Sequence, residues 1–600
     1  MKQAAMSAKL RSADLTESQH RVTLRDGLDL FYRVWRPAGA VRRHLIVLHR
    51  GHEHSGRLED VVQGLALEDT AVYAWDARGH GRSGGDRGWA ESFMELVRDL
   101  EEWVGHLQAE HDLELERTVL CGHSVGAIVA ATWAQAFAPP LAGQILVTPA
   151  FRIRLYVPFA RAGLKLLRRL RGDRRTYVKS YVKAGLLTHD KAQARQYESD
   201  PLITRDIAVN VLLDLRHAAG RLIADAPAMR TPTLVLAGGS DWVVDLATEK
   251  RFFERLGASH KSLRVFPGMY HDILHEVDRD LVLDEMRRFL TGLDHQSTSP
   301  TPLDADQSGP SRDEQLELER PLPWYSPRRW FFAGQRLALA TFGRASAGIR
   351  LGWETGFDSG RSLDYVYENQ PRGLGLFGRW ADRIYLDSPG WRGIRQRRQH
   401  LEGLLERALD ERHCASRPVH LVDIATGAGR YVLSTLARRR SGTVTACLRD
   451  NTEGNLRQGR ATALRLGLEG ISFELGDAFD EEALARLQPA PDVAIVSGLY
   501  ELFPDNLPVL TSLQGLARAM PAGALLIYTG QPWHPQLETI ARVLRNRDGA
   551  RWVMRRRSQE ELDALVRAAG FDKVAMEIGD DGIFTVSLAR RRADRAGGAQ

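Results

Sequence analysis

Two hydrophobic patterns alternate along most of the chain. Short apolar runs, typical of strands buried on both faces, are followed by longer segments with apolar residues at helical spacing. In the first half, residues 21–37 alternate around Asp26-Gly27 and predict a hairpin, and residues 92–111 predict a helix. The buried strands predicted there are 44–48, 72–75, 118–121, 144–148, 233–237 and 263–266. Strands alternating with helices predict a doubly wound, largely parallel α/β sheet.

The second half repeats this alternation after a change of composition. A segment rich in Ser, Thr, Pro and Asp separates the halves and predicts a flexible linker. The next segment is rich in Trp, Phe, Tyr and Arg and is expected to be mainly helical. A second series of strands then ends in a predicted hairpin, 573–578 with 583–588. The predicted organisation is an α/β unit at 15–292 with a helical lid at about 151–230, a linker at 293–321, a helical extension at 322–408 and a second α/β unit at 409–590.

Composition limits the class of protein. A chain of 600 residues exceeds one hydrophobic core, and 43% hydrophobic with 26% charged residues is typical of soluble globular proteins. The three cysteines form neither a disulfide framework nor a metal-ligand spacing. We expect no secretion signal, no membrane span and a cytoplasmic location. The net charge of +6 permits contact with anionic partners without requiring it.

The run at 118–127 contains Gly122-His123-Ser124-Val125-Gly126 between a predicted strand and a predicted helix. This context holds a serine on a sharp turn with its hydroxyl exposed, and the glycines provide space for the turn. Gly81-Arg82-Ser83-Gly84-Gly85 has the same spacing but lies in a glycine-rich loop with no helix behind it. We therefore predict Ser124 as a nucleophile and interpret Ser83 as a loop residue.

Two later strand ends provide partners for Ser124. The strand 233–237 is followed by Asp241, and the strand 263–266 is followed by His271. The order Ser, Asp, His is that of hydrolases with a nucleophile elbow, in which histidine is the base and aspartate orients it. Asp245 is a rival to Asp241 that lies further from its strand end. We expect no metal site among the histidines of this half.

The motifs His49-x-x-x-Glu53-His54-Ser55-Gly56-Arg57, Gly79-His80-Gly81, Gly122-His123-Ser124 and Gly268-x-Tyr270-His271 occur in this order. Residues 20–292 resemble the monoacylglycerol lipase/lysophospholipase, or serine aminopeptidase S33-like, group of α/β-hydrolases. The resemblance implies ester hydrolysis of a single-chain glycerolipid and an oxyanion hole formed by the backbone N–H groups of Arg50 and Val125. That group usually has glycine at the position of Arg50, and we hypothesise that this arginine side chain meets an anionic head group.

The second half contains a glycine loop between a strand and a helix, with Asp423, Gly427 and Gly429. Glycines allow close approach of a ligand, and Asp423 suits an ammonium group better than a pyrophosphate. The next two strands end at Asp450, placed for ribose hydroxyls, and at Asp477 with Phe479, placed for an adenine. By contrast, Gly373-x-Gly375-x-x-Gly378 follows no strand and is interpreted as a turn.

Residues 415–590 together resemble the class I S-adenosylmethionine-dependent methyltransferases. The resemblance implies S-adenosylmethionine as cofactor, with the methionyl end at the glycine loop. Tyr500, Glu501 and His534 are candidate residues to contact or deprotonate the methyl acceptor, although the structural interpretation is favoured for each one taken alone. No motif for methylation of nucleic acid is found, so nucleic acid is not an expected partner.

The predicted function is therefore a bifunctional enzyme, a serine ester hydrolase fused to a methyltransferase acting on a lipid or small molecule. One alternative is an inactive hydrolase unit that serves as an adaptor, and another is a transacylase. Residues 157–171 predict a basic amphipathic helix, interpretable either as peripheral contact with an anionic membrane or as an ordinary lid helix. Both substrates and the oligomeric state stay open.

Overall fold

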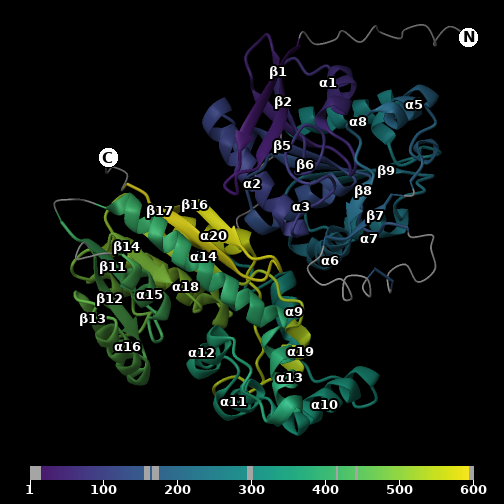
Figure 1. Ribbon diagram of the computed structural model, residues 1–600. Coiled ribbons are helices and arrows are strands. Elements are labelled where there is room, and N and C mark those ends of the chain that lie inside the picture. The colour runs from purple at the N-terminus through teal and green to yellow at the C-terminus, as the bar shows by residue number, and fades with distance from the viewer. Residues whose placement is uncertain are drawn as a thin grey trace, which may run out of the picture. The chain divides into compact units, whose positions relative to one another are not determined.

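The computed structural model describes residues 15–154, 163–164, 175–180, 182–293, 302–413, 417–439 and 444–593 of the chain. It divides into two compact units, Met1–Pro300 and Thr301–Gln600, and each is described by itself. Figure 1 draws the first unit in purple to blue and the second in teal to yellow. Most of the amphipathic segment predicted at 157–171 lies outside the described residues. Within the described parts, no helix is both long and apolar enough to cross a membrane.

The first unit contains an eight-stranded sheet in the order β1-β2-β4-β3-β5-β6-β9-β10. The pairs β1–β2 and β2–β4 are antiparallel, as expected for the predicted hairpin, and the remaining pairs are parallel. The strands are β1 (Leu15–Thr23), β2 (Asp29–Pro37), β3 (Arg43–Leu48), β4 (Thr70–Trp75), β5 (Thr118–His123), β6 (Gly143–Val147), β9 (Thr233–Gly238) and β10 (Lys261–Phe266). This is the α/β sheet predicted from the apolar runs.

Helices cover both faces of this sheet, because every central strand is buried on both faces. Alternate strand residues form one core cluster with apolar residues of α1 and α8, and α2, α3 and α6 pack against one another on the other face. The helices are α1 (Glu59–Leu65), α2 (Phe93–His111), α3 (Val125–Phe137), α5 (Lys191–Ser199), α6 (Val209–Asp225), α7 (Leu246–Arg255) and α8 (Arg279–Gly292).

The predicted lid range 151–230 contains more than one kind of structure. Its described part includes α5 and a two-stranded sheet of β7 (Tyr177–Lys179) and β8 (Asp206–Ala208). Helix α6 contacts α2 and α3 of the helical layer and also β8 of the small sheet.

The second unit has a seven-stranded sheet in the order β13-β12-β11-β14-β15-β17-β16, in which β17 runs antiparallel to both of its neighbours. The first strand, β11, lies between β12 and β14, so the connections reverse direction there, and ligands bind at such switch points. The strands are β11 (Val419–Asp423), β12 (Val444–Asp450), β13 (Ile471–Leu475), β14 (Val493–Val496), β15 (Leu525–Gly530), β16 (Phe571–Ile578) and β17 (Thr585–Arg591).

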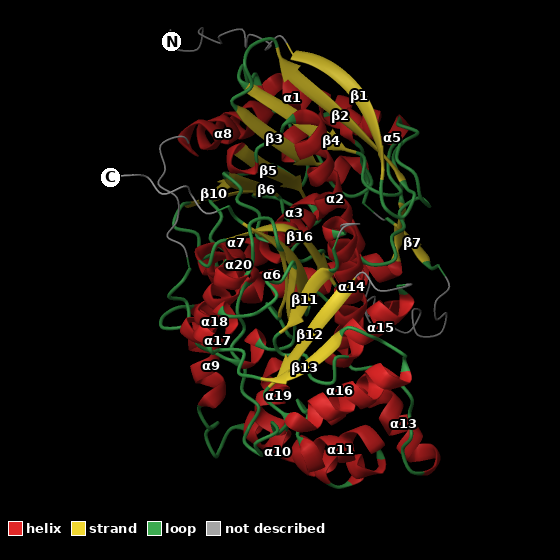
Figure 2. Cartoon of the chain, turned by 90° about the vertical axis from the view of Figure 1, so that its left-hand side faces the viewer, coloured by secondary structure: helices red, strands yellow, loops and turns green. Residues whose placement is uncertain are grey.

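Two core clusters hold helices to the two faces of this sheet. One contains residues of α18 and α20, and the other contains residues of α14 and α15. Figure 2 shows helices in red on both sides of the yellow strands. The core helices are α14 (Pro389–Arg412), α15 (Arg430–Arg438), α16 (Glu453–Arg465), α17 (Glu481–Ala485), α18 (Asn506–Ala519) and α20 (Gln559–Ala568).

The segment before the sheet is helical, as predicted, but it begins earlier and ends later. Helix α9 (Pro310–Glu319) lies within the range predicted as a flexible linker, and its Leu318 packs in a cluster with residues of α19 (Leu537–Val543). That part of the linker prediction is wrong, because one apolar residue in a polar stretch, Leu318, was enough to dock α9 against α19. The other helices are α10 (Pro327–Ala340), α11 (Ala347–Thr355), α12 (Gly360–Glu368) and α13 (Gly375–Leu386).

Candidate functional sites

A sharp turn connects β5 to α3 and places Ser124, which is buried, at its apex. Ser124 has φ of 56° and ψ of −109°, a left-handed region that costs energy for a residue with a Cβ. Its amide donates to the carbonyl of Val147 at 2.8 Å, which fixes the turn to β6. A Cβ on Gly122 would lie 2.5 Å from the Gly126 carbonyl oxygen, and one on Gly126 would lie 2.5 Å from the His49 carbonyl oxygen. Both glycines are therefore required by the turn itself.

The ends of β9 and β10 bring two partners to this serine. Ser124 Oγ lies 2.9 Å from His271 Nε2, and His271 Nδ1 lies 2.8 Å from Asp241 Oδ2. The other carboxylate oxygen of Asp241 accepts from the amides of Val243 and Val244 at 2.6 and 2.9 Å. Burial alone would raise the pKa of Asp241, but His271 and these two amides more than offset burial and lower it. Asp241 is therefore held as a carboxylate beside the imidazole.

The rival aspartate has a different role. Asp245 precedes helix α7 and accepts from Thr248 Oγ1 at 2.7 Å, and Arg152 and Arg154 approach its carboxylate. It is not paired with His271, so the structure selects Asp241. The loop serine Ser83 is buried: its hydroxyl donates to the Asp76 carbonyl at 2.5 Å and accepts from the Phe31 amide at 2.8 Å.

The backbone amide of Val125 directly follows Ser124 at the start of α3, and the backbone amide of Arg50 lies in the turn after β3. Among the described residues, neither amide donates a hydrogen bond within the chain. The Arg50 carbonyl accepts from His49 Nδ1 at 2.7 Å and from the Glu53 amide at 3.3 Å, so the turn after β3 is fixed. Two fixed turns with unused N–H groups are what an oxyanion hole requires.

The side chain of Arg50 is turned into a buried ionic cluster. Its guanidinium lies 2.8 Å from Glu53 and 3.4 Å from Asp272, and it stacks on the ring of Tyr197 at 4.7 Å. The side chain is only 4% exposed. The hypothesis that its charge meets an anionic head group is therefore wrong for this structure, because two carboxylates already compensate that charge. Glu53 is part of the motif itself, but Asp272 lies far away in sequence, so the motif alone did not show the full compensation.

The same cluster continues from Asp272 to a protonated histidine. His275 Nδ1 lies 2.9 Å from Asp272, and its Nε2 donates to the Arg57 carbonyl at 2.8 Å. Burial by itself would lower the pKa of His275, but Asp272, Asp60 and Glu53 raise it to about 10. Arg57 in turn pairs with Glu53 at 2.7 Å. These alternating charges join the turn that carries Arg50 to the loop that carries His271.

Replacing Arg50 with methionine is expected to lower the free energy of unfolding by about 3 kcal/mol, because it leaves buried carboxylates undercompensated. Urea denaturation of the full chain measures this change. Arg117→Met is the matched control, since Arg117 pairs with Glu114 at the surface with its side chain 58% exposed. A change in preference between neutral and anionic esters, without loss of stability, would contradict this role.

In the second unit, the glycine loop lies at the switch point between β11 and β12. Gly427 and Gly429 both have positive φ, 56° and 67°. The Gly427 amide donates to Asp450 Oδ2 at 2.9 Å, and Asp450 Oδ1 accepts from the Thr452 amide at 2.9 Å and from Asn455 Nδ2 at 3.0 Å. A Cβ on Gly427 would meet nothing within 4 Å, so open space lies beside the loop.

Asp423, at the end of β11, is buried and hydrogen bonded. It accepts from the Ala425 amide at 3.2 Å and from the hydroxyl of Tyr431. Burial is the main cause that raises the pKa of Asp423 to about 7. Tyr431 lies on α15, directly after the glycine loop, and was not predicted as a site residue. Its position in the first turn of that helix was the available signal.

The other predicted residues lie at different depths. Asp477, after β13, is exposed and accepts from the Phe479 amide at 2.9 Å, and the Phe479 ring packs edge-on against Phe503 at 4.5 Å.

Gly373 and Gly378 lie where the chain turns into α13, and a Cβ on Gly373 would lie 2.1 Å from the Gly378 carbonyl oxygen. This glycine pattern is therefore a packing requirement of a turn, as predicted.

Family comparisons assign both units. A family model described as "Serine aminopeptidase, S33" matches residues 39–278, and one described as "Putative methyltransferase" matches residues 286–591. "Uncharacterized protein YnbC" of Escherichia coli is 48% identical over 96% of this chain and 98% of its own length. The chain belongs to this family of fused hydrolase and methyltransferase units.

Relatives of the hydrolase unit alone are also found. Human monoglyceride lipase is 31% identical over 42% of this chain and 82% of its own length. A crystal structure of monoacylglycerol lipase from Paleococcus ferrophilus is 23% identical, covers 47% of this chain and 99% of its own chain, and has a TM-score of 0.40. The two family models confirm the prediction of an α/β-hydrolase joined to a methyltransferase.

Of the three candidate acceptor contacts in the methyltransferase unit, one is wrong. The side chain of Tyr500 is 1% exposed in the hydrophobic core, and its hydroxyl donates to Ser512 at 3.0 Å. An apolar strand followed by a polar loop does not reveal which way the first loop side chain turns. Tyr500 is therefore a core residue.

Glu501 and His534 are buried near helix α14 of the methyltransferase unit. Glu501 pairs with Arg397 of α14 at 2.7 Å, and Thr529 approaches the same carboxylate at 3.4 Å. His534 Nδ1 accepts from the Gln536 amide at 3.1 Å, and its Nε2 packs against Gly390 at the start of α14. Burial lowers the pKa of His534 to about 4, so its ring is neutral. Arg397 was missed in the sequence because its partner lies far along the chain.

Proposed function

We propose that the hydrolase unit cleaves the acyl ester of a single-chain glycerolipid, with Ser124 as nucleophile, His271 as general base and acid, and Asp241 as the group that orients the imidazole. The observation that carries this proposal is the hydrogen-bonded row from Ser124 Oγ to His271 to Asp241 on the elbow after β5. The name of the human relative, monoglyceride lipase, supports the substrate class.

The proposed reaction proceeds in two steps. Ser124 Oγ attacks the ester carbonyl carbon while its proton passes to His271 Nε2, and that proton then goes to the leaving glycerol oxygen. Water then attacks the acyl-enzyme while its proton passes to the same imidazole, and the imidazolium returns that proton to Ser124 Oγ as the bond to the fatty acid breaks. The amides of Arg50 and Val125 donate to the carbonyl oxygen as it gains negative charge.

The methyltransferase unit, in the same proposal, binds S-adenosylmethionine at the ends of β11, β12 and β13. The residues fit this group: the open space beside Gly427 admits a ligand. Among the described residues, Asp450 Oδ2 accepts one hydrogen bond, from the Gly427 amide, and retains a lone pair for a ribose hydroxyl. Asp423 would face the ammonium group, and Asp477 with Phe479 would face the adenine. When bound, the cofactor supplies a methyl group on a sulfonium already activated for transfer.

The acceptor in this proposal is a lipid or small molecule, bound under the helices 322–412. The carboxylate of Glu501 is engaged by Arg397, and burial lowers the pKa of His534 to about 4, which makes its ring a weak base. Their contribution is then to align the acceptor with the sulfonium, and alignment alone supplies a large rate enhancement. The experiment that tests the proposal is calorimetric titration of S-adenosylmethionine into the full chain, followed by product analysis with a monoacylglycerol and with lipid extracts.

The affinity for S-adenosylmethionine is expected to fall below pH 7. The raised pKa of Asp423, about 7, means that its carboxyl is protonated below that pH and must ionise to pair with the ammonium group. The dissociation constant should therefore rise about tenfold per pH unit on the acid side. The amino group of the ligand loses its proton above about pH 8, so the dissociation constant should rise again on the alkaline side of the pH profile, its alkaline limb.

Calorimetry across this range measures both limbs. Asp423→Asn is the matched variant: it should bind more weakly and lose the acid limb while keeping the alkaline one. An acid limb that is unchanged in Asp423→Asn would assign the titration to another group.

Two alternatives share most of these residues. An inactive hydrolase unit acting as an adaptor would not react with a fluorophosphonate probe at Ser124. A transacylase would react with the probe but pass the acyl group to an alcohol instead of water, which product analysis distinguishes. The linked row of Ser124, His271 and Asp241 favours an active unit over the adaptor.

A further inference from the structure

Helix α10 carries large apolar residues but buries none of its side chains among the described residues. Trp330, Phe331 and Leu337 are 66%, 60% and 66% exposed, and Trp324 and Tyr325, just before the helix, are 74% and 70% exposed. Exposed large apolar side chains gathered in this way mark an interaction site. Something is therefore expected to cover α10.

The exposed surface continues over neighbouring helices. Helix α10 packs against the 3-10 helix at Phe342–Ala345, which in turn packs against α13. Helix α13 and the residues just before it expose another group of large apolar side chains: Leu374, Leu376, Phe377, Trp380 and Ile384. Figures 1 and 2 show α10, α11 and α13 together at one end of the second unit. We call the exposed apolar residues of 324–384 the aromatic face.

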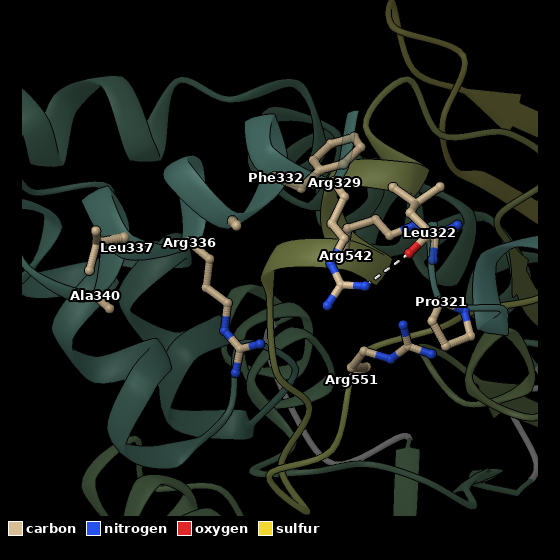
Figure 3. Close-up of a pocket in the computed structure, with 10 residues that line it drawn as sticks. Pro321, Leu322, Arg329, Phe332, Arg336, Leu337, Ala340, Arg542 and Arg551 are labelled. Carbon is tan, nitrogen blue, oxygen red and sulfur yellow. Dashed lines mark hydrogen bonds between the residues drawn. The ribbon is translucent and has the colours of Figure 1, made fainter. Parts of the chain in front are cut away.

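A cavity of about 510 Å³ opens beside α10 (Figure 3). Its apolar wall includes Leu322, Phe332 and Leu337. Four arginines complete the lining: Arg329, Arg336, Arg542 and Arg551. The combination of an apolar wall with several guanidinium groups suits a ligand that is anionic at one end and apolar at the other.

Part of this positive charge has a structural role, and part is not compensated. Arg542 donates to the carbonyls of Glu317 and Arg320, and Arg551 donates to that of Glu319, so both hold the end of α9. Arg329 donates only to the Leu322 carbonyl at 3.2 Å, the dashed line in Figure 3. Among the described residues, Arg336 has no hydrogen bond or ion pair.

Two carboxylates, Glu538 and Glu317, act on the arginines beside the cavity, and Glu538 is already engaged. Glu538 of α19 pairs with Arg328 at 2.6 Å and approaches Arg542 at 3.8 Å. Burial, together with the like charges of Arg551 and Arg328, lowers the pKa of Arg542. The cavity therefore has an excess of positive charge, which an anion would relieve.

We propose that α10 and its arginine-lined cavity bind an anionic phospholipid at a membrane surface, with the phosphate at Arg329 and Arg336 and the aromatic face in the lipid interface. Tryptophan and tyrosine favour the boundary between head groups and acyl chains, and arginines attract anionic head groups. A second copy of the chain fits less well, because a two-fold contact would bring the same arginines together. This proposal is independent of both activities proposed above.

The experiment is flotation of the purified full chain with vesicles of phosphatidylcholine alone or mixed with phosphatidylglycerol. We expect the protein to be retained on the anionic vesicles, and we expect this retention to fall with added salt. The variant Arg329→Ala/Arg336→Ala should bind these vesicles about thirtyfold more weakly, since each of the two arginines contributes a similar factor to the affinity for an anionic surface. Its matched control is Arg465→Ala/Arg486→Ala, which removes two surface arginines elsewhere in the second unit and should bind like the wild type.

The aromatic face is tested with Trp330→Ser/Phe331→Ser, which should also lose retention, against Leu464→Ser, whose side chain is 82% exposed on α16. Thermal unfolding checks that each variant folds, and the milder Arg336→Gln replaces the double arginine variant if that variant does not fold. Equal retention of arginine variant and control overturns the proposal.

Two further outcomes also overturn it. One is binding of inorganic phosphate or glycerol 3-phosphate that depends on Arg336, without retention on any vesicle, which would make the cavity a site for a soluble anion. The other is a dimer, measured by light scattering, that Trp330→Ser/Phe331→Ser converts to a monomer, which would make the aromatic face an interface between copies.

Discussion

Replacing Ser124 with alanine is expected to abolish labelling by a fluorophosphonate probe and to lower kcat for monoacylglycerol hydrolysis by about four to six orders of magnitude. The reason is that the nucleophilic oxygen 2.9 Å from His271 Nε2 is lost, and no other group described here occupies that position. Gel-based labelling and release of fatty acid measure the two effects. Binding of S-adenosylmethionine should be unchanged, since the glycine loop belongs to the other unit.

Ser83→Ala is the matched control, because Ser83 lies in the chain's second Gly-x-Ser-x-Gly pattern. It removes the hydroxyl that accepts from the Phe31 amide, so stability should fall by about 1–3 kcal/mol while labelling persists. Labelling that survives in Ser124→Ala but disappears in Ser83→Ala would reverse the assignment. Absence of labelling in the wild type would favour the adaptor.

Replacing Asp450 with alanine is expected to weaken binding of S-adenosylmethionine by roughly a hundredfold or more, the loss of two hydrogen bonds to a charged group. One is the proposed bond from the ribose. The other is the bond from the Gly427 amide at 2.9 Å, which shapes the loop around the ligand. Calorimetric titration gives the dissociation constant, and the rise of the thermal midpoint with ligand gives an independent measure.

Asp572→Ala provides the control, because Asp572 lies on β16 with its side chain 54% exposed and away from the switch point. It should bind like the wild type. Asp450→Asn keeps the volume of the side chain and separates loss of charge from loss of packing. Wild-type affinity in Asp450→Ala would remove the cofactor assignment at β12, and no binding by the wild type would remove the methyltransferase activity proposed here.

The predicted hydrolase residues are found together because of a property of parallel sheets. The carboxyl ends of neighbouring strands meet at one edge, so Ser124, Asp241 and His271 could be placed near one another from three local patterns. The same reasoning brought Gly427 and Asp450 together in the second unit. Where a side chain points within its loop is set by packing instead, and there the predictions for Arg50 and Tyr500 failed.

The linker and the lid illustrate a second limit. Polar composition favoured a flexible segment at 293–321, but Leu318 docks α9 onto the second unit. Helix α6, which lies in the range predicted as a lid, contacts α2 and α3 as well as β8 of the small sheet. Composition describes the average of a segment, whereas docking depends on a few apolar residues and on the shape of the surface they meet.

The sequence by itself determined two α/β units, the elbow serine with its two partners, and the glycine loop with acidic residues at successive strand ends. These follow from local periodicity and strand order, which short-range rules govern. Only the tertiary structure decided that Arg50 is compensated by Glu53 and Asp272, that Tyr500 lies in the core, and that α10 has an uncovered face beside Arg329 and Arg336. Charge compensation and burial depend on residues far apart in the chain, and their proximity exists only once the chain has folded.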